Sequence, residues 1–361
     1  MIKNRNLILI SVVAGVFVLL VGMTFLKPDS EYSETERRNL KQQPELSLES
    51  VLSGRFMSGF EEYSLDQFPF REALRSLKAS TTLKLDNNAL YVSDESVVKM
   101  EYPLKEESLE RVSERFKNIY DLYLKDSGSN LYLSIIPDKN YFYAKESGHL
   151  SMDYEALVSK VVSDNSYMTY VDIFPLLSAN DYYKTDTHWK QENLADVAEK
   201  LLSVMGNNVE REYRTVQAEG DFYGVYYGQA ALKLKPDKIK YLTNDIIKNM
   251  VAFDYENNKE IPIYDLSKMD EADPYELYVG GPVSLVTIEN QNAETDKELV
   301  VFRDSFGSSV APLLAQGYKK VILVDIRYIQ PGILDKYIDF SDKDVLFLYS
   351  TLVLNNSETL K

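Results

Sequence analysis

Apolar residues recur along the chain with two different periods, and these periods predict helices that alternate with strands. In residues 106–125 the apolar and aromatic side chains fall on one helical face, and residues 191–205 show the same spacing. Five short apolar runs are typical of buried strands: Leu131–Ile136, Met168–Ile173, Leu299–Phe302, Val321–Asp325 and Val345–Tyr349. This alternation predicts an α/β fold in which a parallel sheet is flanked by helices.

The N-terminal part of the chain departs from this alternation. Leu7–Leu26 is a run of 20 residues without a charge, and a helix of this length crosses a hydrocarbon core of about 30 Å. Lys3 and Arg5 precede the run, which favours a cytoplasmic N-terminus. The alternative is a cleaved signal peptide, whose apolar region is about 7–15 residues long and ends at small residues. We therefore expect a cytoplasmic tail over 1–6, a single transmembrane signal anchor over 7–26 and an extracytoplasmic remainder at the cell membrane.

Three further regions follow from the composition of the remainder. Residues 27–80 begin with a polar, charged stretch and continue with helical spacing, which indicates a stalk and a helical lead-in. Residues 81–361 form the expected α/β domain. Within it, residues 207–298 are less regular and rich in Tyr, Asn and Gly, so we expect an insertion with some antiparallel strands.

Composition and charge exclude several classes of function. The 361 residues include no cysteine and only two histidines, His149 and His188. This composition excludes disulfide scaffolds, iron–sulfur clusters, zinc ribbons and thiol catalysis, and it predicts neither a metal site nor a cofactor. The net charge of −16 argues against a nucleic-acid partner, because phosphates would be repelled. Any chemistry that depends on histidine must use one of these two residues.

The segment Asp181–Trp189 contains one of the two histidines and the only tryptophan. Asp186 and His188 are two residues apart, so in an extended segment their side chains point the same way. A carboxylate beside an imidazole fixes its tautomer and stabilises the imidazolium, as a general base requires. The other interpretation is a helix N-cap, because Asp186 or Thr187 could cap the helix that follows.

A second segment, Leu299–Ser309, runs from an apolar strand through Ser305 into a predicted helix. Open α/β sheets bind ligands at the carboxyl ends of their strands, and N–H groups at a helix N-terminus stabilise an oxyanion. Asp304, Ser305 and Ser308 are also good N-cap residues, so capping is again the other interpretation. Together the two segments supply a carboxylate, an imidazole and a hydroxyl on one scaffold.

The four residues Arg303–Phe306 resemble the nucleophile block of SGNH/GDSL hydrolases, with arginine in place of the usual glycine. In those hydrolases the serine precedes the Asp/His pair. Here Asp186 and His188 precede Ser305, which is the order found in the alginate O-acetylation proteins and the related DHHW family. The resemblance implies an SGNH-hydrolase-like sheet.

The segment Tyr183–Trp189 resembles the motif that names the DHHW family, with Thr187 in place of its first histidine. Further motifs of this family are matched in order along the chain by Ser33–Leu40, Ser53–Phe56, Asp66–Arg71, Pro137–Lys139, Phe222–Gly224, Tyr278–Gly281 and Val324–Tyr328. Each match is weak alone, and their order makes the resemblance specific.

The resemblance implies that Ser305 is a nucleophile, His188 its general base and Asp186 the orienting carboxylate. It also implies an extracytoplasmic O-acyltransferase that acetylates a cell-surface polysaccharide, with a membrane-bound O-acyltransferase as acyl supplier. A carbohydrate acetyl esterase and a non-catalytic glycan-binding or scaffold protein are the alternatives. Without Lys3 and Arg5 the expected exported part has 38 basic and 56 acidic residues, and this net charge of −18 favours a neutral polymer or one held by a partner.

Four other residues are candidates for substrate binding. Trp189 and Tyr183 could stack on sugar rings, although aromatic residues at such spacing more often fill a core. Arg303 is the first residue of the predicted nucleophile block and Arg327 belongs to the Val324–Tyr328 motif, and both could contact the substrate. The alternative for Arg327 is a structural ion pair with Asp325 or with the carboxylate of the block.

Overall fold

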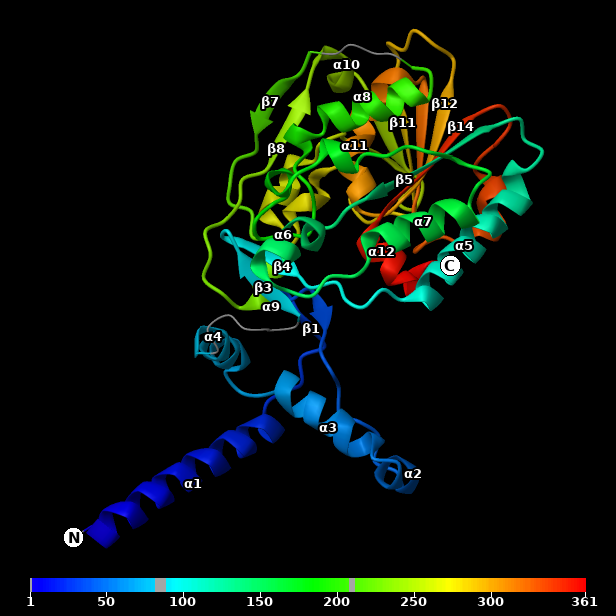
Figure 1. The fold of residues 1–361 in the computed structure, drawn as a ribbon. Coiled ribbons are helices and arrows are strands. Elements are labelled where there is room, and N and C mark those ends of the chain that lie inside the picture. The colour runs from blue at the N-terminus through cyan, green and yellow to red at the C-terminus, as the bar shows by residue number, and fades with distance from the viewer. Residues whose placement is uncertain (1, 82–88, 208–211) are drawn as a thin grey trace. The chain divides into compact units, whose positions relative to one another are not determined.

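The computed structural model of the chain describes residues 2–81, 89–207 and 212–361. The chain divides into two compact units (Figure 1). The first unit contains Met1–Asn88 and Tyr227–Lys233, and the second contains Ala89–Tyr226 and Leu234–Lys361. All residues of the predicted site belong to the second unit.

The first unit consists of short elements: α1 (Ile2–Leu26), β1 (Tyr32–Ser33), β2 (Arg38–Asn39), α2 (Leu48–Leu52), α3 (Arg55–Asp66) and α4 (Arg71–Thr81). Strands β1 and β2 pair in antiparallel fashion. The buried carboxylate of Glu36 forms ion pairs with Arg38, Arg71 and Arg75. This network keeps a buried charge paired, as burial of a carboxylate requires.

The sequence predicts a membrane-spanning helix over Leu7–Leu26. Within residues 2–81, 89–207 and 212–361, no helix combines the length and the apolar character needed to cross a membrane.

An eight-stranded sheet forms the centre of the second unit, in the order β10-β9-β11-β13-β12-β14-β5-β6. Strands β13, β12, β14, β5 and β6 run parallel, whereas β10, β9 and β11 are antiparallel neighbours at the other edge. The bounds are β5 (Asn130–Ile136), β6 (Thr169–Tyr170), β9 (Val251–Asp254), β10 (Lys259–Ile261), β11 (Leu285–Glu289), β12 (Glu298–Arg303), β13 (Lys320–Val324) and β14 (Asp344–Ser350). The predicted α/β fold with a largely parallel sheet is confirmed.

Helices cover both faces of this sheet (Figure 1). One face packs against α8 (Ala195–Val204) and α11 (Phe306–Leu314), and the other against α5 (Glu106–Ile119), α7 (Tyr154–Asp164) and α12 (Thr351–Asn355). Successive side chains of a strand point to opposite faces of the sheet. In β12, Leu299 and Val301 pack in the core with α8 and α11, whereas Val300 and Phe302 pack in the core with α5, α7 and α12. The central strands are continuous apolar runs because both faces are buried.

The second unit also contains α6 (Lys139–Ser147), α10 (Asp245–Lys248), the hairpin of β3 (Leu90–Ser93) with β4 (Ser96–Lys99), and that of β7 (Arg214–Gln217) with β8 (Lys240–Thr243). Helix α9 (Val225–Ala230) begins in the second unit and ends in the first. Short 3-10 turns lie at Phe174–Leu176, Ala179–Asp181, Gln191–Asn193, Leu266–Asp270, Pro274–Leu277, Ala315–Gly317, Pro331–Lys336 and Ser357–Thr359.

The ends of several elements differ from the sequence predictions. The helix predicted over 106–125 is α-helical to Ile119 and continues as a π-helix over Tyr120–Leu124. Met168–Ile173 contributes only the two residues of β6, since an edge strand pairs on one side. Residues 207–298, predicted to be an insertion, contain antiparallel strands, and three of these strands, β9, β10 and β11, belong to the central sheet.

Candidate active site

The carboxyl ends of β12, β14 and β5 meet at one edge of the sheet, because these strands are parallel neighbours. The chain leaves β12 through Asp304, which is fully buried. One carboxylate oxygen of Asp304 accepts a hydrogen bond from the Phe306 N–H at 3.0 Å. The other accepts from the Ser350 N–H at 2.8 Å and the Ser350 hydroxyl at 2.6 Å. These bonds fix the turn between β12 and α11 against the end of β14.

Ser305 lies on this turn, at the N-terminus of α11, with helical φ and ψ of −60° and −27°. Within the described chain its side chain makes no capping hydrogen bond, so the capping interpretation of Ser305 is wrong. The residue is partly exposed, whereas α11 is buried along its length. Gly307 permits a close approach here, because an added Cβ would lie 2.6 Å from Arg303 Cβ.

The second half of the site is the loop Tyr182–Trp189, which a single antiparallel β-bridge between its end residues closes. Asp186 in this loop is 1% exposed. Its Oδ1 accepts from the His188 N–H at 2.9 Å and from His188 Nδ1 at 2.6 Å, and its Oδ2 accepts from the Val225 N–H at 2.9 Å. The helix that follows begins only at Ala195, which places Asp186 too far away to cap it.

Electrostatics keep Asp186 ionised. Burial acts to raise the pKa of this carboxyl, but the charge and hydrogen bonds of His188 and the Val225 N–H outweigh burial and hold the pKa well below its usual range. A carboxylate can only accept hydrogen bonds, so His188 Nδ1 must carry a proton to make this bond. Its Nε2 is then the acceptor for the Ser305 hydroxyl, at 2.8 Å. The structure therefore brings Ser305, His188 and Asp186 into one chain of hydrogen bonds.

Tyr275 completes the surroundings of His188, and the sequence patterns did not point to it. Its ring stacks on the imidazole with a centroid distance of 3.8 Å and an interplanar angle of 6°. Its hydroxyl bonds to Ser309 Oγ of α11 at 2.8 Å. The ring thus limits rotation of His188 from one face. Nothing in the sequence around Tyr275 connects this residue with a distant histidine.

The predicted sugar contacts of Trp189 and Tyr183 are corrected by the structure. Both side chains are 0% exposed, so neither ring offers a face to a sugar. The Trp189 indole N–H donates to the Phe306 carbonyl at 3.1 Å and to Ser309 Oγ at 2.8 Å. Tyr183 packs edge-on against Phe222 at 5.0 Å. These aromatic residues fill the core, which is the alternative that the sequence left open.

Arg303 and Arg327 both bind to other groups of the protein. Arg303 is 0% exposed, and its guanidinium donates to the Gly281 and Val283 carbonyls at 3.3 and 3.4 Å. A buried guanidinium cannot reach a substrate in this arrangement, so its predicted substrate contact is also corrected. Arg327 forms a two-bond ion pair with Asp325 at 2.9 and 2.6 Å, as the structural alternative predicted.

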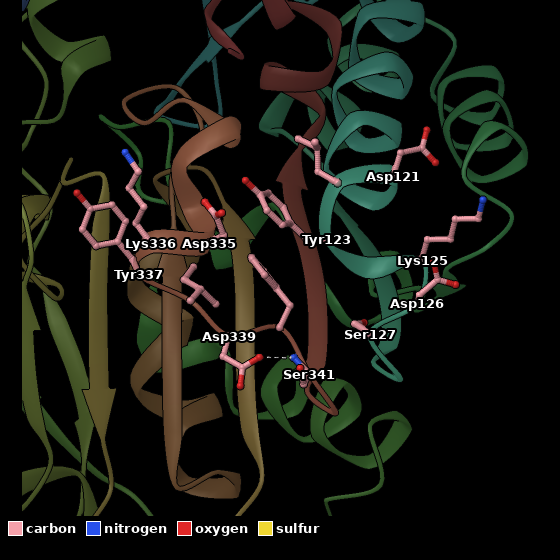
Figure 2. A pocket seen from close by; sticks show the side chains of 13 residues that line it. Asp121, Tyr123, Lys125, Asp126, Ser127, Asp335, Lys336, Tyr337, Asp339 and Ser341 are labelled. Carbon is pink, nitrogen blue, oxygen red and sulfur yellow. Dashed lines mark hydrogen bonds between the residues drawn. The ribbon is translucent and has the colours of Figure 1, made fainter.

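A cavity of about 680 Å³ lies at the opposite edge of the sheet (Figure 2). Its lining residues, in 121–127 and 335–341, precede β5 and β14, whereas Ser305 follows β12. This cavity is therefore separate from the hydrogen-bonded chain. In the described part of the protein, no group of three or more His, Asp or Glu side chains is arranged to hold a metal ion.

Solved structures of similar fold include a DHHW family protein from Eubacterium siraeum DSM 15702, with a TM-score of 0.59 and 19% identity over 76% of this chain and 95% of that chain. They also include PatB1 of Bacillus cereus with a sulfonyl adduct, with a TM-score of 0.60 and 20% identity over 75% of this chain and 97% of that chain. At these identities the similarity shows the fold alone. One of the two structures is a DHHW family protein, and the sequence motifs resemble the same family. No protein-family model matches the chain, and no curated protein sequence does.

Proposed function

We propose that this protein is an O-acyltransferase that acetylates a cell-surface polysaccharide through Ser305, His188 and Asp186. The observation that carries the proposal is the chain of hydrogen bonds from Ser305 Oγ to His188 Nε2, at 2.8 Å, and from Nδ1 to Asp186, at 2.6 Å. This arrangement activates a serine hydroxyl for attack on an acyl carbonyl.

The first half-reaction forms an acyl-serine. Ser305 Oγ attacks the carbonyl carbon of the acyl donor while His188 Nε2 takes the hydroxyl proton. Collapse of the tetrahedral intermediate breaks the bond to the leaving oxygen, which receives that proton from the imidazolium. Asp186 remains ionised and stabilises the imidazolium, and the N-terminus of α11 supplies partial positive charge beside the oxyanion.

The second half-reaction transfers the acyl group. A hydroxyl of the polysaccharide attacks the ester carbonyl and gives its proton to His188. Collapse releases the acetylated polymer and returns the proton to Ser305 Oγ. Water in place of the polysaccharide hydroxyl would make the same site an esterase, so the acceptor decides between the two activities.

One structural comparison and the sequence motifs support the proposal. PatB1 of similar fold has been solved with a sulfonyl adduct, and capture of a sulfonyl electrophile is a reaction expected of an activated hydroxyl. The polysaccharide acceptor, the acetyl group and a membrane-bound O-acyltransferase as acyl supplier rest on the DHHW and alginate O-acetylation motifs. An extracytoplasmic location, which the N-terminal sequence predicts, would bring the site to that polymer.

The decisive experiment removes each end of the hydrogen-bonded pair. We expect Ser305→Ala and His188→Ala each to lower turnover of 4-nitrophenyl acetate by about 10³-fold or more, because the nucleophile or its base is lost. Ser305→Ala should also abolish covalent labelling by a fluorophosphonate, read by mass spectrometry. The matched control is His149→Ala, which changes the other histidine, located beside Tyr91 and Ser147, and should retain full turnover.

Wild-type turnover in Ser305→Ala, with the label attached elsewhere, would contradict the proposal. To separate transfer from hydrolysis, neutral cello-, manno- and xylo-oligosaccharides are supplied with the same ester. Oligosaccharides that gain the mass of one acetyl group identify a transferase. Release of acetate alone, at every acceptor concentration, identifies an esterase.

A further inference from the structure

Lys139 is a buried cation that the proposed reaction does not use. It is the first residue of α6 and is 3% exposed. Its Nζ donates to the carbonyl oxygens of Tyr183 at 2.9 Å and Lys184 at 3.2 Å. These two residues begin the stretch that leads to Asp186. Burial lowers the pKa of Lys139 to about 7, although the Asp186 carboxylate acts to raise it.

The same stretch is held from its other side by Asp237. One oxygen of this carboxylate accepts from the Lys184 N–H at 3.0 Å. The other accepts from the Thr185 N–H and the Thr185 hydroxyl, each at 2.7 Å. Carbonyl groups of the loop therefore accept hydrogen bonds from the Lys139 amine, and N–H groups of the loop donate to the Asp237 carboxylate. A donor on one side and an acceptor on the other side fix the peptide planes that precede Asp186.

Asp138, the residue before Lys139, is connected through hydrogen bonds to the turn that carries Ser305. Asp138 is 2% exposed and accepts from the Thr351 hydroxyl at 2.7 Å and from the Asn140 N–H at 2.7 Å. Thr351 follows Ser350, which binds Asp304. Neighbouring residues at the start of α6 thus contact both the loop of the base and the edge that carries the nucleophile.

We infer that Lys139 is a positioning residue whose two hydrogen bonds hold the Tyr183–Lys184 peptides so that Asp186 and His188 meet Ser305. Without them the loop would keep its β-bridge, and the Lys184 carbonyl would keep its bond from the Val97 N–H at 2.8 Å, but the Tyr183 carbonyl would lose its bond from Lys139 Nζ. A displacement of about 1 Å at a catalytic group lowers turnover by about 10²-fold. The kinetic test of this inference rests on the proposed function. The spectroscopic test rests only on the hydrogen bond between His188 Nδ1 and Asp186.

The test uses Lys139→Met, which keeps a long, unbranched side chain and removes both donors. We expect kcat for 4-nitrophenyl acetate to fall about 10- to 100-fold, with KM changed less than about 2-fold. The control is Lys184→Met, because that side chain pairs with Glu95 at the surface and should be dispensable. Lys139→Gln, which is too short to reach both carbonyls, should act in the same direction if Lys139→Met does not fold.

Proton NMR provides a readout that does not need turnover. The chain has only two histidines, so the downfield ring proton on His188 Nδ1 is identified by its loss in His188→Gln. We expect this signal to shift or broaden in Lys139→Met and to stay in place in Lys184→Met. Wild-type kcat together with an unchanged signal in both Lys139 variants would overturn the inference. A signal that responds in a protein without esterase or transferase activity would support the positioning role and contradict the proposed function.

Discussion

The two halves of the site are positioned by different physical means. Ser305 lies on a turn between a strand and a helix, and the backbone of that turn is bound to the neighbouring strand through Asp304. His188 lies on an irregular loop closed by one β-bridge, and the side chains of Lys139 and Asp237 fix its peptide planes. Both halves therefore use a buried carboxylate, but the nucleophile also lies directly between a strand and a helix, whereas the base lies on a loop without regular structure. Loss of one polar group should harm the base more than the nucleophile.

The largest contrast is expected between two buried carboxylates. In Asp186→Asn an amide replaces the acceptor of the His188 ring proton, so the wrong tautomer is favoured and kcat should fall about 10³- to 10⁴-fold. In Asp304→Asn an amide meets the Ser350 N–H and hydroxyl. That change should lower the free energy of unfolding by about 1–3 kcal/mol and reduce kcat by less than about 100-fold.

Both variants are measured by ester turnover and by urea unfolding followed by circular dichroism. Equal losses of kcat in two equally stable variants would contradict the comparison, because they would show that both carboxylates act on the reacting groups. A stable Asp304→Asn with wild-type turnover would show instead that β12 and α11 hold the turn without this carboxylate.

Much of the fold could be predicted because its signals are local. The apolar runs that became β5, β12, β13 and β14 match the observed strands within about one residue at either end, since strands buried on both faces are continuous in sequence. The length of the edge strand β6 was overestimated. This strand pairs with a neighbour on one side, which limits its length, and the sequence does not show which strands lie at an edge. The π-helix after α5 was missed because only the five residues Tyr120–Leu124 adopt the wider turn, which is too short a stretch to change the period of the apolar positions.

The candidate site was predictable only where chemistry and local structure coincide. Ser305 follows an apolar strand, and Asp186 and His188 are two residues apart, so each segment carries its own signal. Lys139 was noted within a motif, but its partners lie 44 and 45 positions away in the chain. Tyr275 had no signal, because its stacking on His188 exists only after the sheet has formed. Burial of Trp189 likewise depends on α11, which the sequence does not place beside it.

Two glycines allow the halves to be compared without changing a polar group. A Cβ on Gly224 would lie 2.3 Å from Asp186 Cβ and 2.5 Å from its Cα, whereas a Cβ on Gly307 would lie 2.6 Å from Arg303 Cβ. Gly224→Ala should therefore displace the Asp186 backbone and lower kcat about 10- to 100-fold. Gly307→Ala should mainly reduce stability, by about 1–3 kcal/mol, with a loss of kcat below about 10-fold.

The control for this pair is Gly332→Ala, since among the described residues no atom lies within 4 Å of a Cβ added there. Ester turnover and urea unfolding are measured for all three variants. A larger loss of kcat in Gly307→Ala than in Gly224→Ala would reverse the comparison, because it would make the regular turn the more sensitive half.

The smallest effect is expected at Trp189, which joins the two halves. It follows His188 in the loop, and its indole N–H donates to Phe306 and Ser309 of α11. In Trp189→Phe the Phe306 carbonyl keeps the Ser309 hydroxyl at 3.2 Å, and Ser309 keeps the Tyr275 hydroxyl at 2.8 Å. Because these buried groups retain partners, the free energy of unfolding, measured by urea unfolding followed by circular dichroism, should fall by only about 1–2 kcal/mol.

The same variant tests the corrected role of this tryptophan. A ring that is 0% exposed cannot stack on a sugar, so KM for an oligosaccharide acceptor should change less than about 2-fold while kcat falls only a few-fold. A rise in acceptor KM of about 10-fold at unchanged stability would mean that the loop opens and presents the indole to the glycan. In that event the irregular half of the site would bind substrate as well as hold the base, and the difference between the two halves would extend from positioning to recognition.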